Sequence, residues 1–142
     1  MEKSAKSIVQ SNFDRFKSYE GSDHIATRSS QINMLTLLES IKPREILEFG
    51  AGIGTLTALA LENSEANITA VEKNKWCLEQ FAVHNLPNNR IMLTQSMPMS
   101  NHYDFYIIDD AISINEVCKI FDGKKNPSLF LSKGKDLQPS RN

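Results

Sequence analysis

Residues 45–61 read EILEFGAGIGTLTALAL. The stretch opens with a short apolar run that contains one acid, Glu48, and continues through glycines at positions 50, 52 and 54 into an alanine- and leucine-rich segment. Such a short apolar run is typical of a buried parallel strand, and the closing segment has helical character. Glycines allow the backbone to pass close to a ligand where a Cβ atom would intrude. The stretch therefore predicts a strand, a ligand-facing glycine turn and a helix.

The same alternation of strand and helix continues along the chain. Further apolar runs predict strands at 67–72, 90–94, 103–109 and 128–131, and helical segments at 76–82 and 114–120 lie between them. Strands that alternate with helices form parallel sheets through right-handed crossovers. We therefore predict an α/β fold, with a doubly wound, Rossmann-like sheet of about five parallel strands and flanking helices.

Two helices are predicted ahead of the first strand. Apolar residues at three- and four-residue offsets predict a helix over 4–20 that Gly21 ends. A second helix has Ser29 or Ser30 as its N-cap and Pro43 as its stop. We expect a single domain over 1–142, which comprises N-terminal helices (1–42), a core with the glycine turn (43–132) and a tail (133–142).

The composition fits one compact domain without a dominant charge. The 142 residues are 40% hydrophobic, and 16 basic against 17 acidic side chains give a net charge of -1. This balance provides no global positive field, so a nucleic-acid partner is not favoured. No stretch approaches the roughly 18 to 20 apolar residues of a membrane span and no signal-peptide core is visible, so we expect a soluble, cytoplasmic protein. Cys77 and Cys118 lack zinc-site spacing, which predicts reduced thiols and no structural metal.

Polar residues gather where the predicted strands end. In an open parallel sheet the ligand lies at the carboxyl ends of the strands, near the point where the strand order reverses. The residues at those ends are Glu48 with the glycine turn, Glu72, Gln95 with Ser96, and Asp109 with Asp110. We therefore predict that these residues form one site.

The glycine spacing distinguishes between kinds of phosphate and nucleotide site. A dinucleotide fingerprint requires glycine or alanine at position 55, where this chain has Thr55. A nicotinamide-dependent oxidoreductase is therefore a disfavoured hypothesis for this chain. A Walker A loop requires lysine after its last glycine, and Thr55 follows Gly54, which excludes a P-loop here. Glu48, directly ahead of the glycines, would repel a pyrophosphate. A cationic ligand is the better expectation.

The pattern Glu48-x-Gly50-x-Gly52-x-Gly54, with Glu72 closing the second strand, resembles class I S-adenosylmethionine-dependent methyltransferases. The resemblance runs from about residue 43 to 131 and implies S-adenosylmethionine as cofactor. It implies that Glu48 and the turn Gly50, Ala51, Gly52 and Gly54 hold the methionine part, and that Glu72 holds the ribose. It further implies that Lys73, Gln95 and Ser96 lie at the adenine and that Asp109 lies beside cofactor and acceptor.

The residues after the fourth strand bear on the branch of this family. Residues 47–57 also look like rRNA adenine dimethylases, but those enzymes carry Asn-Leu-Pro-Tyr where this chain has Ile-Asp-Asp-Ala at 108–111. The segment 103–110 is closer to catechol-type O-methyltransferases, which bind a divalent cation, yet two adjacent carboxylates alone form a poor octahedral site. We expect methyl transfer to an oxygen or nitrogen of a small-molecule acceptor, with Asp109 and Asp110 as catalytic candidates. The alternative is a catalytically inactive binding module or partner subunit.

Three further expectations concern less specific features. The resembling family adds a C-terminal β-hairpin that this chain, with eleven residues after Leu131, is expected to lack. The fifth strand would then be an open edge, which predicts a homodimer or a partner subunit at that edge. His24 is a candidate for the substrate side, and Trp76 is expected to serve in packing rather than as a platform for adenine.

Overall fold

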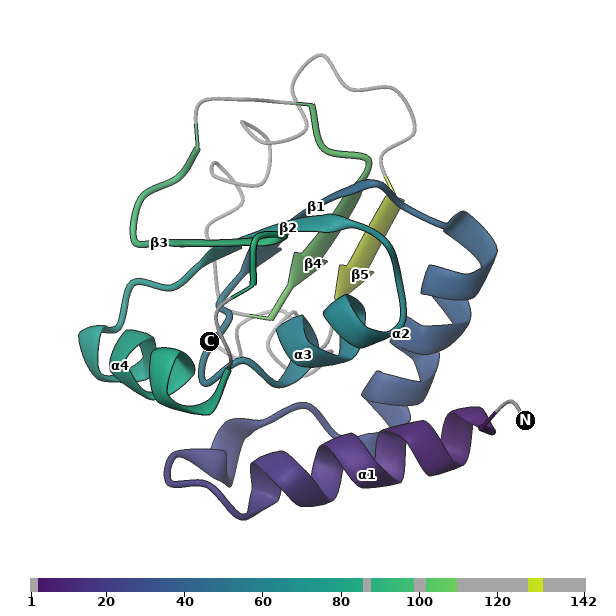
Figure 1. Cartoon of the computed structure of the whole chain (residues 1–142), viewed down its shortest axis with the longest axis horizontal. Helices are drawn as coiled ribbons and strands as arrows, with labels where there is room; N and C mark the ends of the chain where they lie inside the picture. Colours follow the sequence, from purple (N-terminus) through teal and green to yellow (C-terminus); the bar gives the residue numbers. More distant parts are fainter. Residues whose placement is uncertain (1–2, 86–87, 99–101, 110–127, 132–142) are drawn as a thin grey trace, which may run out of the picture.

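The computed structural model describes residues 3–85, 88–98, 102–109 and 128–131, and its centre is a parallel sheet (Figure 1). The five described strands have the order β3-β2-β1-β4-β5. Their bounds are β1 Glu45–Phe49, β2 Asn67–Val71, β3 Ile91–Thr94, β4 Phe105–Ile108 and β5 Ser128–Leu131. The prediction of about five parallel strands is confirmed, and the strand order reverses between β1 and β4.

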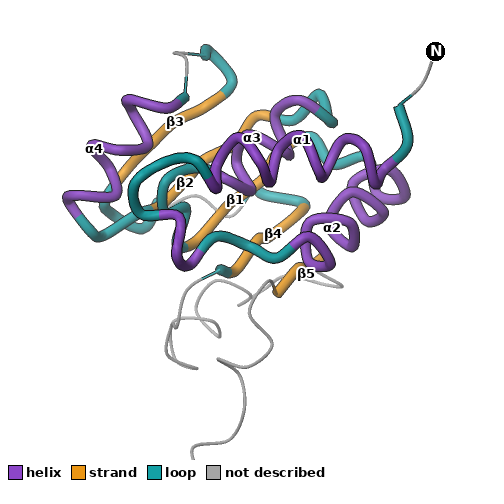
Figure 2. Tube along the Cα trace, turned by 90° about the horizontal axis from the view of Figure 1, so that it is seen from below, coloured by secondary structure: helices purple, strands orange, loops and turns teal. Residues whose placement is uncertain are grey.

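The described helices all cover the same face of this sheet, as Figures 1 and 2 show. They are α1 Ala5–Lys17, α2 Arg28–Ile41, α3 Thr55–Glu62 and α4 Lys75–His84, with a short 3-10 turn at Ser22–His24. The helix expected on the other face, at 114–120, lies outside the described residues. No described helix is long and apolar enough to cross a membrane.

Alternation along the strands explains why they read as continuous apolar runs. Ile46, Ile68 and Phe105 pack in one cluster with residues of α1, α2 and α3. Leu47 and Tyr106, which neighbour them in sequence, belong to a second cluster on the opposite face. Because both sets are buried, neither face keeps the polar positions that a solvent-exposed sheet would show.

The ends of α2 differ in part from expectation. Thr27, rather than Ser29 or Ser30, is the N-cap, and its hydroxyl oxygen accepts a hydrogen bond from the Ser30 backbone N–H at 3.1 Å. The prediction chose the cap too late, because all three residues are good caps and only the backbone conformation separates them. At the other end α2 stops at Ile41 as expected, and its C-cap Lys42 has a left-handed φ of 50° directly ahead of Pro43, which cannot continue a helix.

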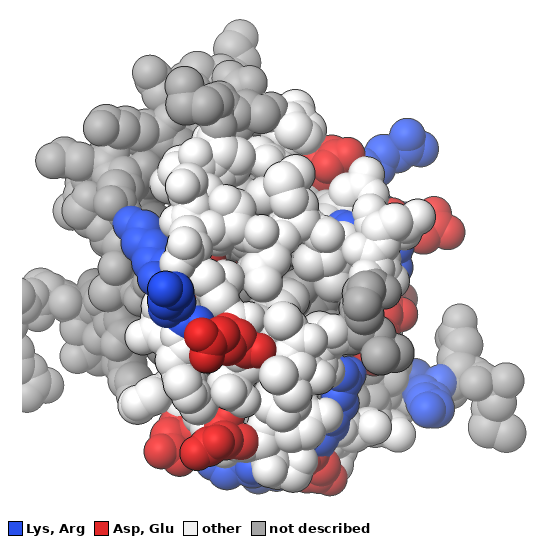
Figure 3. Space-filling view, turned by 60° about the vertical axis from the view of Figure 1, so that its left-hand side comes forward, with Lys and Arg blue, Asp and Glu red and all other residues white. Residues whose placement is uncertain are grey.

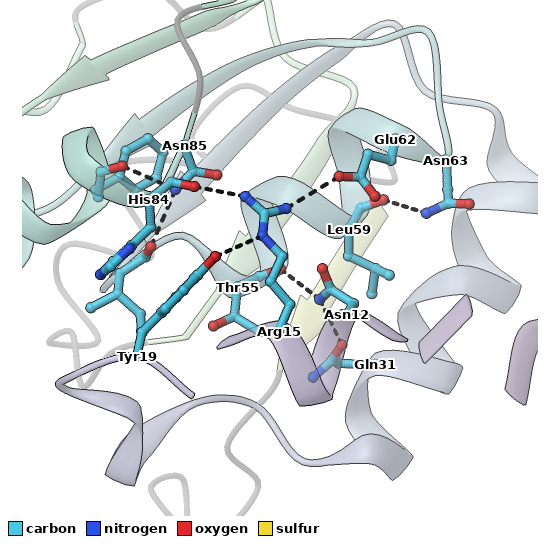
Figure 4. A network of polar contacts seen from close by, with 12 residues as sticks. Asn12, Arg15, Tyr19, Gln31, Thr55, Leu59, Glu62, Asn63, His84 and Asn85 are labelled. Atoms are coloured by element: carbon cyan, nitrogen blue, oxygen red, sulfur yellow. Dashed lines mark hydrogen bonds and ion pairs between the residues drawn. The ribbon is translucent and has the colours of Figure 1, made fainter. Parts of the chain in front are cut away.

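A polar network joins α1 to the elements that carry the glycine turn (Figure 4). The Asn12 amide, which is buried, donates to Gln31 Oε1 at 2.9 Å and to the Thr55 carbonyl at 3.1 Å. The Arg15 guanidinium donates to the Tyr19 hydroxyl and to the carbonyl of His84 at the end of α4. The N-terminal helices are therefore fixed against the first turn of α3, immediately beyond the glycines.

Candidate functional site

The glycine turn follows β1 and is anchored to the end of β2. Gly50, Gly52 and Gly54 have φ values of 74°, 59° and 101°, a left-handed region that favours glycine. The backbone N–H groups of Gly50 and Ala51 donate to the carbonyl of Val71 at 2.9 and 3.2 Å. Glycine is favoured at these positions because the turn, which is anchored to β2, requires positive φ values.

Glu72 connects the glycine turn to α4. One carboxylate oxygen, Oε1, accepts a hydrogen bond from the Gly52 backbone N–H at 2.7 Å, and Oε2 accepts one from the Asn74 backbone N–H at 2.8 Å. Asn74 caps α4 through its side chain, which accepts from the Cys77 N–H at 3.0 Å. Although only 7% of Glu72 is exposed, it forms part of a cavity wall, so the same residue orders the turn and faces the cavity.

A cavity of about 490 Å³ lies at the carboxyl ends of β1, β2 and β4. It includes six residues predicted for the site: Gly50, Ala51, Gly52, Glu72, Lys73 and Asp109. Its other lining residues are Gly21, His24, Ile25, Ile53, Thr55, Asn74, Trp76 and Cys77. The short segment Gly21–Ile25, far from the glycine turn in sequence, therefore supplies one wall, and His24 lies where the sequence placed a substrate-side candidate.

Glu48 lies behind the glycine turn and does not line the cavity. It is fully buried, and its Oε1 accepts a 2.5 Å hydrogen bond from the Thr57 hydroxyl, whereas Oε2 has no hydrogen-bond partner among the described residues. Burial raises the pKa of this carboxyl to about 8, against the opposing effect of the Thr57 bond, and the nearby Asp109 and Glu72 carboxylates raise it further. The expectation of a charged Glu48 facing the ligand is wrong, because the sequence does not reveal how completely α3 covers the end of β1.

Two other parts of the predicted site lie elsewhere. Gly54 is not in the cavity wall, and a Cβ atom built on it would lie 2.3 Å from Asn85 Nδ2, so it permits contact between the turn and the end of α4. Gln95 and Ser96 follow β3 as expected, but both are exposed and neither lines the cavity. Asp110 lies outside the described residues. The strand-end rule thus led to the end of the sheet where the cavity lies, but it could not say which strand-end side chains line that cavity.

The sequence analysis missed Gly21, Ile25, Asn74, Trp76 and Cys77 as wall residues. For Asn74 and Trp76 a signal existed, since both follow the strand-end acid Glu72 closely and lie at the cap and first turn of the next helix. Gly21 and Ile25 carry no such signal, because only tertiary packing brings them over the glycine turn.

On the face shown in Figure 3, basic and acidic side chains lie among one another with no broad basic patch among the described residues. Within the described ranges, no group of three or more His, Cys, Asp or Glu side chains is placed to hold a metal ion.

The sequence matches no protein-family model and no curated protein, whereas the fold has many solved neighbours. The S-adenosylhomocysteine-bound methyltransferase PaMTH1 from Podospora anserina gives a TM-score of 0.60 at 16% identity, over 73% of this chain and 50% of that chain. An O-methyltransferase from Bacillus cereus, also with S-adenosylhomocysteine, gives a TM-score of 0.59 at 17% identity, over 78% of this chain and 56% of that chain. TomG, an O-methyltransferase from Streptomyces achromogenes in complex with S-adenosylmethionine, gives a TM-score of 0.54 at 14% identity, over 90% of this chain and 62% of that chain.

The chain therefore has the class I, Rossmann-like fold of S-adenosylmethionine-dependent methyltransferases. It spans between 50% and 62% of the length of these three solved chains.

Proposed function

We propose that this methyltransferase-fold protein binds S-adenosylmethionine and transfers its methyl group to an oxygen or nitrogen of a small-molecule acceptor. The observation that carries the proposal is the cavity at the strand ends, which has the left-handed glycine turn in one wall and the Glu72 carboxylate in another. The fold neighbours that contain S-adenosylmethionine or S-adenosylhomocysteine support the choice of ligand.

The residues present fit this cofactor. A Cβ atom built on Gly52 would meet nothing within 4 Å, so the protein leaves space beside the turn that a ligand can fill. Each Glu72 oxygen accepts one backbone hydrogen bond and retains a second lone pair, which suits the two hydroxyls of a ribose. We assign the methionine part to Gly50, Ala51 and Gly52, and the ribose to Glu72.

Asp109 is our candidate for the acceptor side. When bound, S-adenosylmethionine supplies an electrophilic methyl group on a sulfonium. Asp109 lines the cavity at the end of β4, where its backbone N–H donates to the Phe49 carbonyl at 2.9 Å and fixes its position beside the turn. A carboxylate there can orient an acceptor hydroxyl or amine and accept its proton. His24 and Ile25 also line the cavity.

A second candidate function is a binding module without turnover. In that case the cavity would bind the cofactor and no acceptor would be methylated. We also predict Asp110 as a second catalytic carboxylate. The methylation rates of variants at Asp109 and Asp110 test the two residues together.

Isothermal titration of the wild-type protein with S-adenosylmethionine and S-adenosylhomocysteine tests the proposal. Glu72→Gln is the informative variant, because its amide oxygen keeps one of the two backbone hydrogen bonds, while its NH2 group can accept neither from the other backbone N–H nor from a ribose hydroxyl. We expect its affinity to fall about tenfold or more, and Glu79→Gln, on the exposed side of α4, to match the wild type. Absence of binding by the wild-type protein would refute the proposal, and binding without methylation in an acceptor screen would select the module.

A further inference from the structure

A buried carboxyl group lies directly behind the glycine turn, and the proposed transfer leaves it without a role. Glu48 is fully buried on β1, and its register partners on the neighbouring strands are the buried apolar residues Ala70 and Ile107. Thr57 of α3 donates to its Oε1, whereas Oε2 has no hydrogen-bond partner among the described residues. Because an ionised carboxylate is costly in such surroundings, they favour the protonated group.

The charges of the cavity wall act on Glu48 across the turn. Burial is the largest cause of its raised pKa, and the carboxylates of Asp109 and Glu72, which both line the cavity, raise this pKa further against the effect of the Thr57 hydrogen bond. The wall and the buried carboxyl are therefore coupled electrostatically, although Glu48 does not line the cavity. Since negative charge at the wall favours the protonated form, positive charge there favours the ionised form.

The proposed cofactor and its product differ by one positive charge. S-adenosylmethionine carries a sulfonium, which is a cation, whereas S-adenosylhomocysteine carries a neutral thioether after the methyl group has left. The remainder of the two molecules is the same. A group that responds to charge at the cavity wall can therefore distinguish the methyl donor from the product.

We infer that Glu48 is a specificity-determining residue, which releases its proton when the sulfonium enters the cavity and retains it when the neutral thioether is bound. The inference rests on the proposed function. It requires no contact between Glu48 and the ligand, because the carboxylate attracts the sulfonium through the electric field across the turn. In this step only the O–H bond of the carboxyl breaks, and its proton passes to the solvent.

Release of this proton makes the affinity for the methyl donor depend on pH. When binding lowers the pKa of a group, the affinity rises with pH between the pKa of the complex and the pKa of the free protein. Burial raises the pKa of Glu48 to about 8 in the free protein, so the rise is expected mainly below that pH. If the sulfonium lowers the pKa by about one unit, affinity increases by up to about tenfold, and about half a proton is released near pH 7.5.

The experiment compares the full-length wild type with Glu48→Gln, which can still accept the Thr57 hydrogen bond but has no proton to release. Calorimetry gives the affinities for S-adenosylmethionine and S-adenosylhomocysteine between about pH 6 and about pH 8.5, and buffers of different ionisation enthalpy give the number of protons released. The ligand's own groups titrate equally with both proteins, so the difference between the proteins isolates residue 48. Glu39→Gln, at an exposed position on α2, is the matched control.

We expect the affinity of wild type for S-adenosylmethionine, relative to that of Glu48→Gln, to rise about five- to tenfold across this pH range. The same ratio for S-adenosylhomocysteine should stay constant, and Glu39→Gln should match wild type with both ligands. A ratio that is independent of pH, or that changes equally for both ligands, would overturn the role of Glu48 while leaving cofactor binding established. A wild-type protein that binds neither ligand would overturn the proposed function as well.

Discussion

Glu48→Gln tests the electrostatics of the buried acid behind the glycine turn. Glutamine has nearly the same shape, and its amide oxygen can accept the Thr57 hydroxyl bond that Glu48 Oε1 accepts in the wild type. It cannot ionise. The substitution therefore removes the proton equilibrium of residue 48 while it keeps the packing around it.

The magnitude follows from the pKa. Burial raises the Glu48 pKa from 4.5 to about 8 in the folded protein, so below pH 4.5 the carboxyl is neutral in both states and imposes no penalty. Between these values the unfolded chain loses the proton that the folded chain retains, and stability falls by about 1.4 kcal/mol per pH unit. The total loss of unfolding free energy reaches about 5 kcal/mol near pH 8 and is constant above it. The unfolding free energy of a typical domain is roughly 5 to 15 kcal/mol, so this loss is a large part of it.

The assay is urea unfolding of wild type and Glu48→Gln at several values between about pH 5 and pH 7.5. We expect the unfolding free energy of the variant, relative to wild type, to increase by about 1.4 kcal/mol per pH unit across this range. Glu39→Gln, at an exposed position on α2, is the control and should show no such trend. A difference between Glu48→Gln and wild type that is flat with pH would refute the buried neutral carboxyl.

Three further predictions follow from other features. The Arg90 guanidinium donates to the carbonyl of Leu61 in the last turn of α3 and to those of Ser64 and Ala66 just after it. Arg90→Lys should therefore lower the unfolding free energy by about 1 to 3 kcal/mol in chemical denaturation, whereas an equal loss from exposed Arg44→Lys would contradict this role. Asp109→Asn should reduce the methylation rate at least about a hundredfold while S-adenosylhomocysteine affinity in calorimetry stays close to wild type; a parallel loss of affinity would argue against a base. β5 is an edge strand of the described sheet, and the backbone groups of an edge strand can pair with another chain. We therefore expect the protein to associate as its concentration rises in sedimentation velocity. A sedimentation coefficient that remains that of a monomer at all concentrations would disprove this.

The strand and helix pattern of this chain could be predicted because it depends on local sequence. The predicted strand at 128–131 coincides with β5. The predicted strand at 67–72 begins with β2 and ends one residue later, and the predicted helix at 76–82 begins one residue after α4 and ends two residues before it. β1, β2 and β4 are buried on both faces, so they had to be largely apolar in sequence, whereas Met92 of β3 is 62% exposed.

The candidate site was predictable only where the backbone itself makes the wall. Gly50 and Gly52 could be predicted from the glycine spacing after the first strand, and Glu72 from its place at the end of the second strand. The structure places all three in the wall of the cavity, with positive φ values at both glycines. Glu48 and Gln95 satisfied the same sequence rule, yet one is covered by α3 and the other is exposed to solvent.

The sequence by itself determined the order of the elements, the glycine turn and the acid that closes the second strand, because these depend on residues close together in the chain. The tertiary structure decided that Glu48 is buried, which raises its pKa to about 8, and that Gly21 packs against Trp76. The physical reason is that burial and contact between distant segments depend on how helices pack on the sheet, and no local pattern records that packing.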